Sequence, residues 1–205
     1  MAKKIIFYTT TDSPCKKDAT GAFIPEAKKF AAYHGDVVLC GIPCRGQSRD
    51  QRAQRVYDEL AKHDKVESVV FACHGHPTHF QHGFGIRGKH RISKLASILS
   101  VKSVKSVVFY CCSVARPNLK VGPYSLCGEL HRCMRTFGHN TAVIGHTTAG
   151  HTTWNANVKV FINGDYAGKF IVDPGSPDWK KWCDKLRKHP TYRYQFPYDA
   201  ELDLS

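Results

Sequence analysis

One stretch decides the predicted fold: residues 68–75 read Ser-Val-Val-Phe-Ala-Cys-His-Gly. The apolar run shows no alternation with polar residues, so we expect a strand that is buried on both faces. Residues 106–112 read Ser-Val-Val-Phe-Tyr-Cys-Cys and repeat the pattern. Further apolar runs lie at residues 5–8, 37–40 and 141–145. Strands of this kind are typical of a mainly parallel sheet enclosed by helices.

Helix signals alternate with these strands. Residues 25–35 begin with a proline and end with a glycine, as helices often do. Residues 48–51 have the form of a capping box and begin a second helix. Residues 92–99 and 126–137 carry apolar side chains at helical spacing. We therefore predict an α/β fold, a three-layer αβα sandwich, formed as a single domain over residues 1–205.

The pattern changes in the C-terminal part. Residues 158–162 and 166–172 flank Asn163-Gly164, and Asn-Gly suits the positive φ angles of a tight turn. This predicts a C-terminal hairpin. A last helix is expected to begin at Pro177, because apolar side chains follow it at helical spacing.

Cysteine content and hydropathy favour a reduced, cytoplasmic location. Nine cysteines is an odd number, and most of them lie within the predicted strands and helices. A disulfide scaffold would be shorter and richer in loops. No apolar run approaches the roughly 20 residues of a membrane span, so no membrane partner is expected. Residues 1–8 are interpreted as the first strand and not as a signal peptide.

The formal net charge is +13, which invites a nucleic-acid interpretation. However, the basic residues are scattered over the outward faces of the predicted helices. The distribution indicates non-specific binding of polyanions more than sequence-specific binding of nucleic acid.

His74 and Cys112 directly follow two consecutive predicted strands. Consecutive parallel strands usually lie close together, and functional groups gather at their carboxyl ends. A thiol reacts as the thiolate, and a nearby imidazole can take its proton and later protonate a leaving amine. Gly75 allows a close backbone approach, and its N–H and that of Cys112 would suit an oxyanion hole. The pair predicts nucleophilic catalysis by a thiol.

These residues resemble a known family. The strand-His-Gly element at 69–75 and the strand-Cys-Ser element at 107–113 are similar to the caspase-like superfamily of cysteine peptidases. Within it they look most like the CHAT branch, relatives of caspases, separases and gingipains. Residues 85–99 and 126–145 are similar to the family's elements between the two motifs and after the second. The resemblance covers roughly residues 5–144.

The resemblance implies a caspase-like sheet with His74 as base, Cys112 as nucleophile and Gly75 as oxyanion donor. The implied activity is that of a hydrolase, a thiol protease that cleaves a protein or peptide substrate through an acyl-thioester. A regulatory protein partner is a further possibility, and no cofactor or metal is implied. Cys111 stands where the family usually has a small apolar residue, so the sequence leaves the choice between Cys111 and Cys112 open.

Substrate-binding residues are expected in loops at the same edge of the sheet. His146 and Trp154 follow the strand at 141–145, and Asp12 follows the first strand. Asp12 would favour a Lys or Arg before the scissile bond. Arg45 or Arg116 would favour an acidic residue there, and both preferences stay open.

Two alternatives remain. The cluster of one cysteine and four histidines at positions 73, 74, 76, 79 and 82 contains zinc-binding residue types, but its spacing matches no closed structural site. The chain could also be a catalytically inactive caspase-like module that binds protein or nucleic acid through a basic surface.

Overall fold

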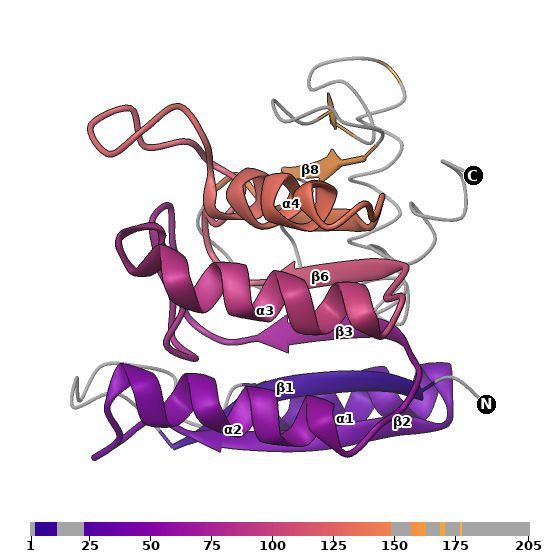
Figure 1. Cartoon of the computed structure of the whole chain (residues 1–205). Coiled ribbons are helices and arrows are strands. Elements are labelled where there is room, and N and C mark those ends of the chain that lie inside the picture. Colours follow the sequence, from indigo (N-terminus) through magenta and orange to yellow (C-terminus); the bar gives the residue numbers. More distant parts are fainter. Residues whose placement is uncertain (1–2, 12–22, 149–156, 163–168, 171–176, 178–205) are drawn as a thin grey trace.

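The computed structural model describes residues 3–11, 23–148, 157–162, 169–170 and 177. Within these residues, a seven-stranded sheet has the order β2-β1-β3-β6-β7-β8-β9 (Figure 1). The strands β2, β1, β3, β6 and β7 are parallel, β8 is antiparallel to β7, and β9 is antiparallel to β8. The mainly parallel sheet and the C-terminal hairpin are thus confirmed. The bounds are β1 Lys3–Thr11, β2 Val37–Pro43, β3 Val66–Ala72, β6 Ser106–Tyr110, β7 Ala142–His146, β8 Val158–Phe161 and β9 Lys169–Phe170.

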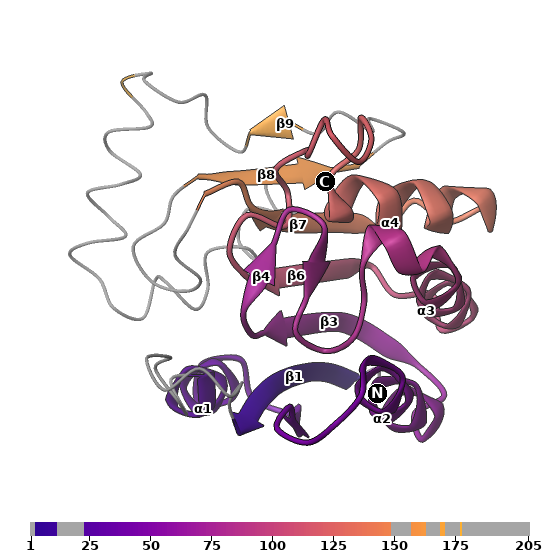
Figure 2. The same cartoon turned by 90° about the vertical axis from the view of Figure 1, so that its left-hand side faces the viewer.

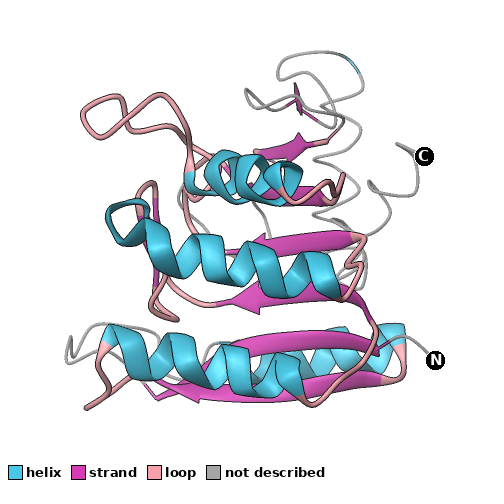
Figure 3. Cartoon of the chain, viewed as in Figure 1, coloured by secondary structure: helices cyan, strands magenta, loops and turns pink. Residues whose placement is uncertain are grey.

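Helices cover both faces of the sheet. Helix α1 (Phe23–His34) lies on one face, whereas α2 (Arg49–Ala61), α3 (Lys89–Val101) and α4 (Leu126–Thr136) lie on the other (Figures 2 and 3). The predicted three-layer αβα sandwich is therefore confirmed. The predicted C-terminal helix lies outside the described residues, apart from Pro177. None of the helices in the described ranges has the length and apolar character that a membrane crossing needs.

Each central strand contributes to two separate cores. Phe71 and Phe109 are register partners and belong to the core beneath α2, α3 and α4. Their neighbours Ala72 and Tyr110 belong to the core beneath α1. Successive side chains of a strand point to opposite faces, so a run that is apolar at every position feeds both cores.

The sequence signal for α2 is reproduced in atomic detail. The Gln51 amide donates to Ser48 Oγ at 3.2 Å, and the Ser48 amide donates to Gln51 Oε1 at 2.7 Å. These two bonds form the capping box and satisfy amide groups that the helix itself leaves unpaired.

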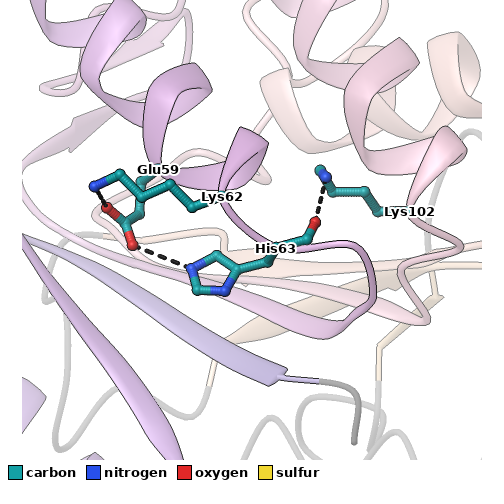
Figure 4. A network of polar contacts seen from close by, with 4 residues as sticks. All are labelled: Glu59, Lys62, His63 and Lys102. Atoms are coloured by element: carbon teal, nitrogen blue, oxygen red, sulfur yellow. Dashed lines mark hydrogen bonds and ion pairs between the residues drawn. The ribbon is translucent and has the colours of Figure 1, made fainter.

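The opposite end of α2 is tied to the end of α3. Lys102, which caps α3, donates a hydrogen bond to the carbonyl oxygen of His63 (Figure 4). Glu59 accepts from Lys62 at 2.7 Å and is 3.1 Å from the His63 ring. The hydrogen bond from Lys62 lowers the pKa of Glu59. The network fixes the C-terminal ends of α2 and α3. These ends lie at the edge of the sheet opposite to the C-terminal ends of β3 and β6.

The segment between β3 and α3 contains elements that the sequence did not predict. A short antiparallel hairpin joins β4 (Gly75–His76) to β5 (His79–Phe80), and a 3-10 turn, η1 (Ile86–Gly88), precedes α3. Strands of two residues have too few positions to show a period, so a sequence pattern cannot reveal them. Helix α3 also begins at Lys89, three residues before the predicted start.

Candidate functional site

Strands β3 and β6 end side by side. They are parallel neighbours whose last register pair is Ala72 with Tyr110. The sulfur atoms of the next two residues, Cys73 and Cys111, lie 3.5 Å apart, so the two chains are still close together just beyond the strands. His74 and Cys112 follow as the next two positions. The structure thus brings the backbone positions of the predicted pair to one edge of the sheet.

Gly75 lies against the chain at the end of β6. A Cβ atom built on it would lie 2.6 Å from the Cys112 carbonyl oxygen and 2.9 Å from the Cys112 amide nitrogen. It would also lie 2.7 Å from the Cβ of Cys111. Real Cβ atoms essentially never come this close to other atoms, so only glycine fits here. The hairpin after β3 therefore packs directly on the backbone of Cys112.

His74 lies on the α1 face of the sheet. Its ring meets the Phe23 ring edge-on, with centroids 5.1 Å apart. Tyr110 is buried on the same face, and alternation along the chain favours this face for Cys112, two residues later. His74 and Cys112 are both partly exposed.

Cys111 occupies a different environment from Cys112. Its side chain is fully buried in the opposite core, and its thiol donates to the Phe71 carbonyl oxygen at 3.4 Å. Burial and the adjacent Cys73 sulfur raise the pKa of Cys111 well above its usual value. A buried, protonated thiol is a poor nucleophile. The sequence left open whether Cys111 or Cys112 is the candidate nucleophile, and the burial of Cys111 favours Cys112.

Gln81 holds the backbone of His74 from both sides. Its amide donates to the His74 carbonyl oxygen at 3.0 Å, and its Oε1 accepts from the His74 amide at 3.3 Å. Thr9 at the end of β1 donates to the same Oε1 at 3.0 Å and lies 3.2 Å from His82 Nε2. The sequence did not single out Gln81, because a lone glutamine in a loop has no pattern that signals it.

Cys112 is followed by a tight turn. Ser113 has a φ of 56°, which is uncommon for a residue other than glycine. The Ser113 amide donates to the Thr148 carbonyl oxygen at 3.0 Å, and the Ala115 amide donates to that of His146 at 2.9 Å. The chain after β6 is therefore held between the hairpin after β3 and the loop after β7.

Of the three predicted substrate-binding residues, the structure describes only His146. His146 ends β7 at the expected edge, but its side chain is buried, with its ring centroid 6.5 Å from that of Tyr110. Asp12 and Trp154 lie outside the described residues.

The predicted histidine cluster is divided. Cys73 and His82 are buried in the core, whereas His76 and His79 lie on the surface with ring centroids 4.9 Å apart. In the part of the chain that the structure describes, no group of three or more His, Cys, Asp or Glu side chains is placed to hold a metal ion.

A cavity of about 560 Å³ adjoins His74 and Gly75. Arg45 and Arg116, which the sequence suggested for an acidic substrate, do not line it. Although His79 is exposed, partial desolvation of its ring in the cavity wall lowers its pKa, and the positive charges of His76 and Arg49 lower it further. The lining includes four arginines that the sequence analysis did not single out: Arg49, Arg52, Arg87 and Arg91.

A methyl group at position 75 tests the packing of the site. Because the new Cβ would meet backbone atoms, we expect Gly75→Ala to lower the free energy of unfolding by about 1–3 kcal/mol. Gly122→Ala is the matched control, since a Cβ there has no atom within 4 Å. Urea unfolding of both variants measures the difference. Equal stabilities would show that the hairpin does not press on Cys112.

Compared with known families and curated proteins, the chain matches no family model and no curated sequence.

Proposed function

We propose that the chain is a caspase-like cysteine peptidase, similar to the CHAT branch, that hydrolyses peptide bonds of a protein substrate. One observation carries the proposal: Gly75, directly after His74, packs on the backbone of Cys112 at the ends of two neighbouring parallel strands. An imidazole-bearing and a thiol-bearing residue thus adjoin the same short stretch of backbone. A cytoplasmic location suits a reactive thiol, because that compartment keeps thiols reduced.

The proposed reaction begins with transfer of the Cys112 proton to His74. The Cys112 sulfur then attacks the carbonyl carbon of a peptide bond, and the negative charge moves to the carbonyl oxygen. Backbone N–H groups of Gly75 and Cys112 are the proposed donors to that oxygen. The C–N bond breaks, His74 returns the proton to the leaving amine, and an acyl-thioester remains on Cys112. Water, deprotonated by His74, hydrolyses the thioester and restores the thiol.

Cys112 is also the described cysteine best placed to react. Five of the others, at positions 44, 73, 111, 127 and 133, are buried. Cys40 is partly exposed, but burial and the charge of Glu59 raise its pKa to about 11. At pH 8 only about one Cys40 side chain in a thousand would be thiolate.

Labelling with a thiol-reactive peptide probe, followed by mass spectrometry of the digested protein, tests the proposal. We expect one modified site at Cys112 in the unaltered protein. Labelling should disappear in Cys112→Ala, fall at least tenfold in His74→Ala and persist in Cys111→Ala.

The same experiment separates the proposal from its alternatives. Labelling that survives Cys112→Ala would remove Cys112 as nucleophile. A folded protein that no peptide probe labels, and that hydrolyses no peptide, would point to the catalytically inactive binding module instead.

A further inference from the structure

The cavity beside His74 carries an unusual concentration of positive charge. Four arginines line it, and His76 and His79 stand in the same wall. Among the described residues, no Asp or Glu lines the cavity. Asp50 is the nearest counter-charge on α2, and its carboxylate pairs with Arg91 at 2.6 Å while remaining largely exposed. Counted over the described residues, four arginines and this one carboxylate leave an excess of three positive charges.

Two helices also begin at this cavity. Helix α2 contributes Arg49 and Arg52 from its first turn, and α3 contributes Arg91 from its own. The N-cap of α3 is Gly88, which supplies no capping side chain, and the first turn of α3 contains no acidic residue. The first amide groups of a helix point along its axis and favour an anion. The start of α3 thus adds to the attraction of the arginines, whereas the start of α2 is closed by its own capping box.

Two of the arginines are held in place by the protein. Arg52 Nη1 donates to the carbonyl oxygens of Cys44 at 3.3 Å and Gln47 at 3.2 Å. Arg91 Nη1 is held by Asp50. The Nε atoms of Arg52 and Arg91 are buried and have no hydrogen-bond partner among the described residues. The hydrogen bonds of Nη1 order these two guanidinium groups before any ligand binds, which favours binding.

We propose that this cavity binds a small molecule that carries two or more phosphate groups. Arginine forks and helix amides match phosphate oxygens in both charge and geometry. A single carboxylate brings one negative charge, which would leave most of the lining unpaired. The volume lies within the range of cavities that enclose small ligands. Binding here does not depend on the proposed peptidase chemistry.

Isothermal titration with sodium tripolyphosphate tests this proposal. We expect one binding site per chain, with an affinity that falls as salt rises. The test variant is Arg49→Gln/Arg87→Gln, because neither side chain makes a hydrogen bond or ion pair with the described residues. The control is Arg55→Gln/Arg135→Gln, which removes the same charge from exposed positions outside the cavity. The test variant should lose roughly tenfold or more in affinity, and the control less than twofold.

Three results would overturn the proposal. Absence of tripolyphosphate binding is the first. The second is an equal loss in the two double variants, which would reveal general attraction to the basic surface. The third is tight binding of a tetraglutamate peptide. If this peptide binds as tightly as tripolyphosphate and through the same arginines, the cavity would be assigned to an acidic peptide segment. Peptide labelling at Cys112 is measured separately, so this proposal and the proposed function can fail independently.

Discussion

Replacing His74 by alanine is expected to lower kcat/KM by about 10²–10⁴-fold on any peptide that the unaltered protein cleaves. The variant lacks the group that accepts the Cys112 proton and later protonates the leaving amine. Without it, no imidazole takes the proton of the thiol, and the amine must depart without being protonated. Initial rates at low substrate concentration give kcat/KM directly.

His139→Ala is the matched control for His74→Ala. His139 lies between α4 and β7, which is the edge of the sheet opposite to His74, and does not line the cavity. Its loss should change kcat/KM by less than about twofold. Urea unfolding of both variants shows whether either one is destabilised. If His74→Ala remains folded and retains more than a tenth of the activity, His74 is not the general base.

The fold was predictable because its signals are long and regular. Residues 69–72 and 107–110 are apolar at every position, and only a sheet covered on both faces buries such strands. The capping box at Ser48 also marks a helix start from local chemistry alone, and the structure contains both of its hydrogen bonds. Apolar runs and a capping box are both formed by residues close together in the sequence, so they can be recognised without coordinates.

The meeting of the two strand ends was predictable for a related reason. His74 and Cys112 each stand two residues beyond the end of a strand, after a buried cysteine, and the parallel register of β3 and β6 brings both strand ends to the same edge of the sheet. Gly75 was a useful signal because a close backbone approach requires it. The choice between Cys111 and Cys112 needed coordinates, because burial of one sulfur and exposure of the other are tertiary properties.

The basic cavity could not be predicted from the sequence. Its arginines come from the first turn of α2, from η1 and from the first turn of α3, which are separated by about 40 residues. Each arginine taken alone resembles an ordinary solvated residue on a helix. Their convergence follows from the way the hairpin after β3 folds over the end of the sheet, and that hairpin had no sequence signal.

The largest loss of stability is expected from Phe71→Ala. Phe71 is fully buried at the centre of the sheet and stacks on Phe7 at 5.4 Å and on Phe109 at 5.1 Å between ring centroids. Phe80, from the hairpin over the site, packs against it at 5.0 Å. Truncation removes buried apolar surface and leaves a cavity among rings that cannot all move inward. We expect a loss of about 3–5 kcal/mol in the free energy of unfolding.

Phe137→Ala is the control for Phe71→Ala, because the Phe137 side chain is largely exposed at the end of α4. Phe137→Ala should lower the free energy of unfolding by less than about 1 kcal/mol, and urea unfolding measures both values.

Since Phe71 supports Phe80, the hairpin that carries Gly75 should also loosen in Phe71→Ala. Probe labelling at Cys112 should then slow even where the protein is still folded. If both variants lose the same free energy of unfolding, the surrounding rings have moved into the space that the Phe71 ring leaves. Unchanged labelling of a destabilised Phe71→Ala protein would mean that the hairpin is held by its contacts at the strand ends and not by the aromatic core beneath it.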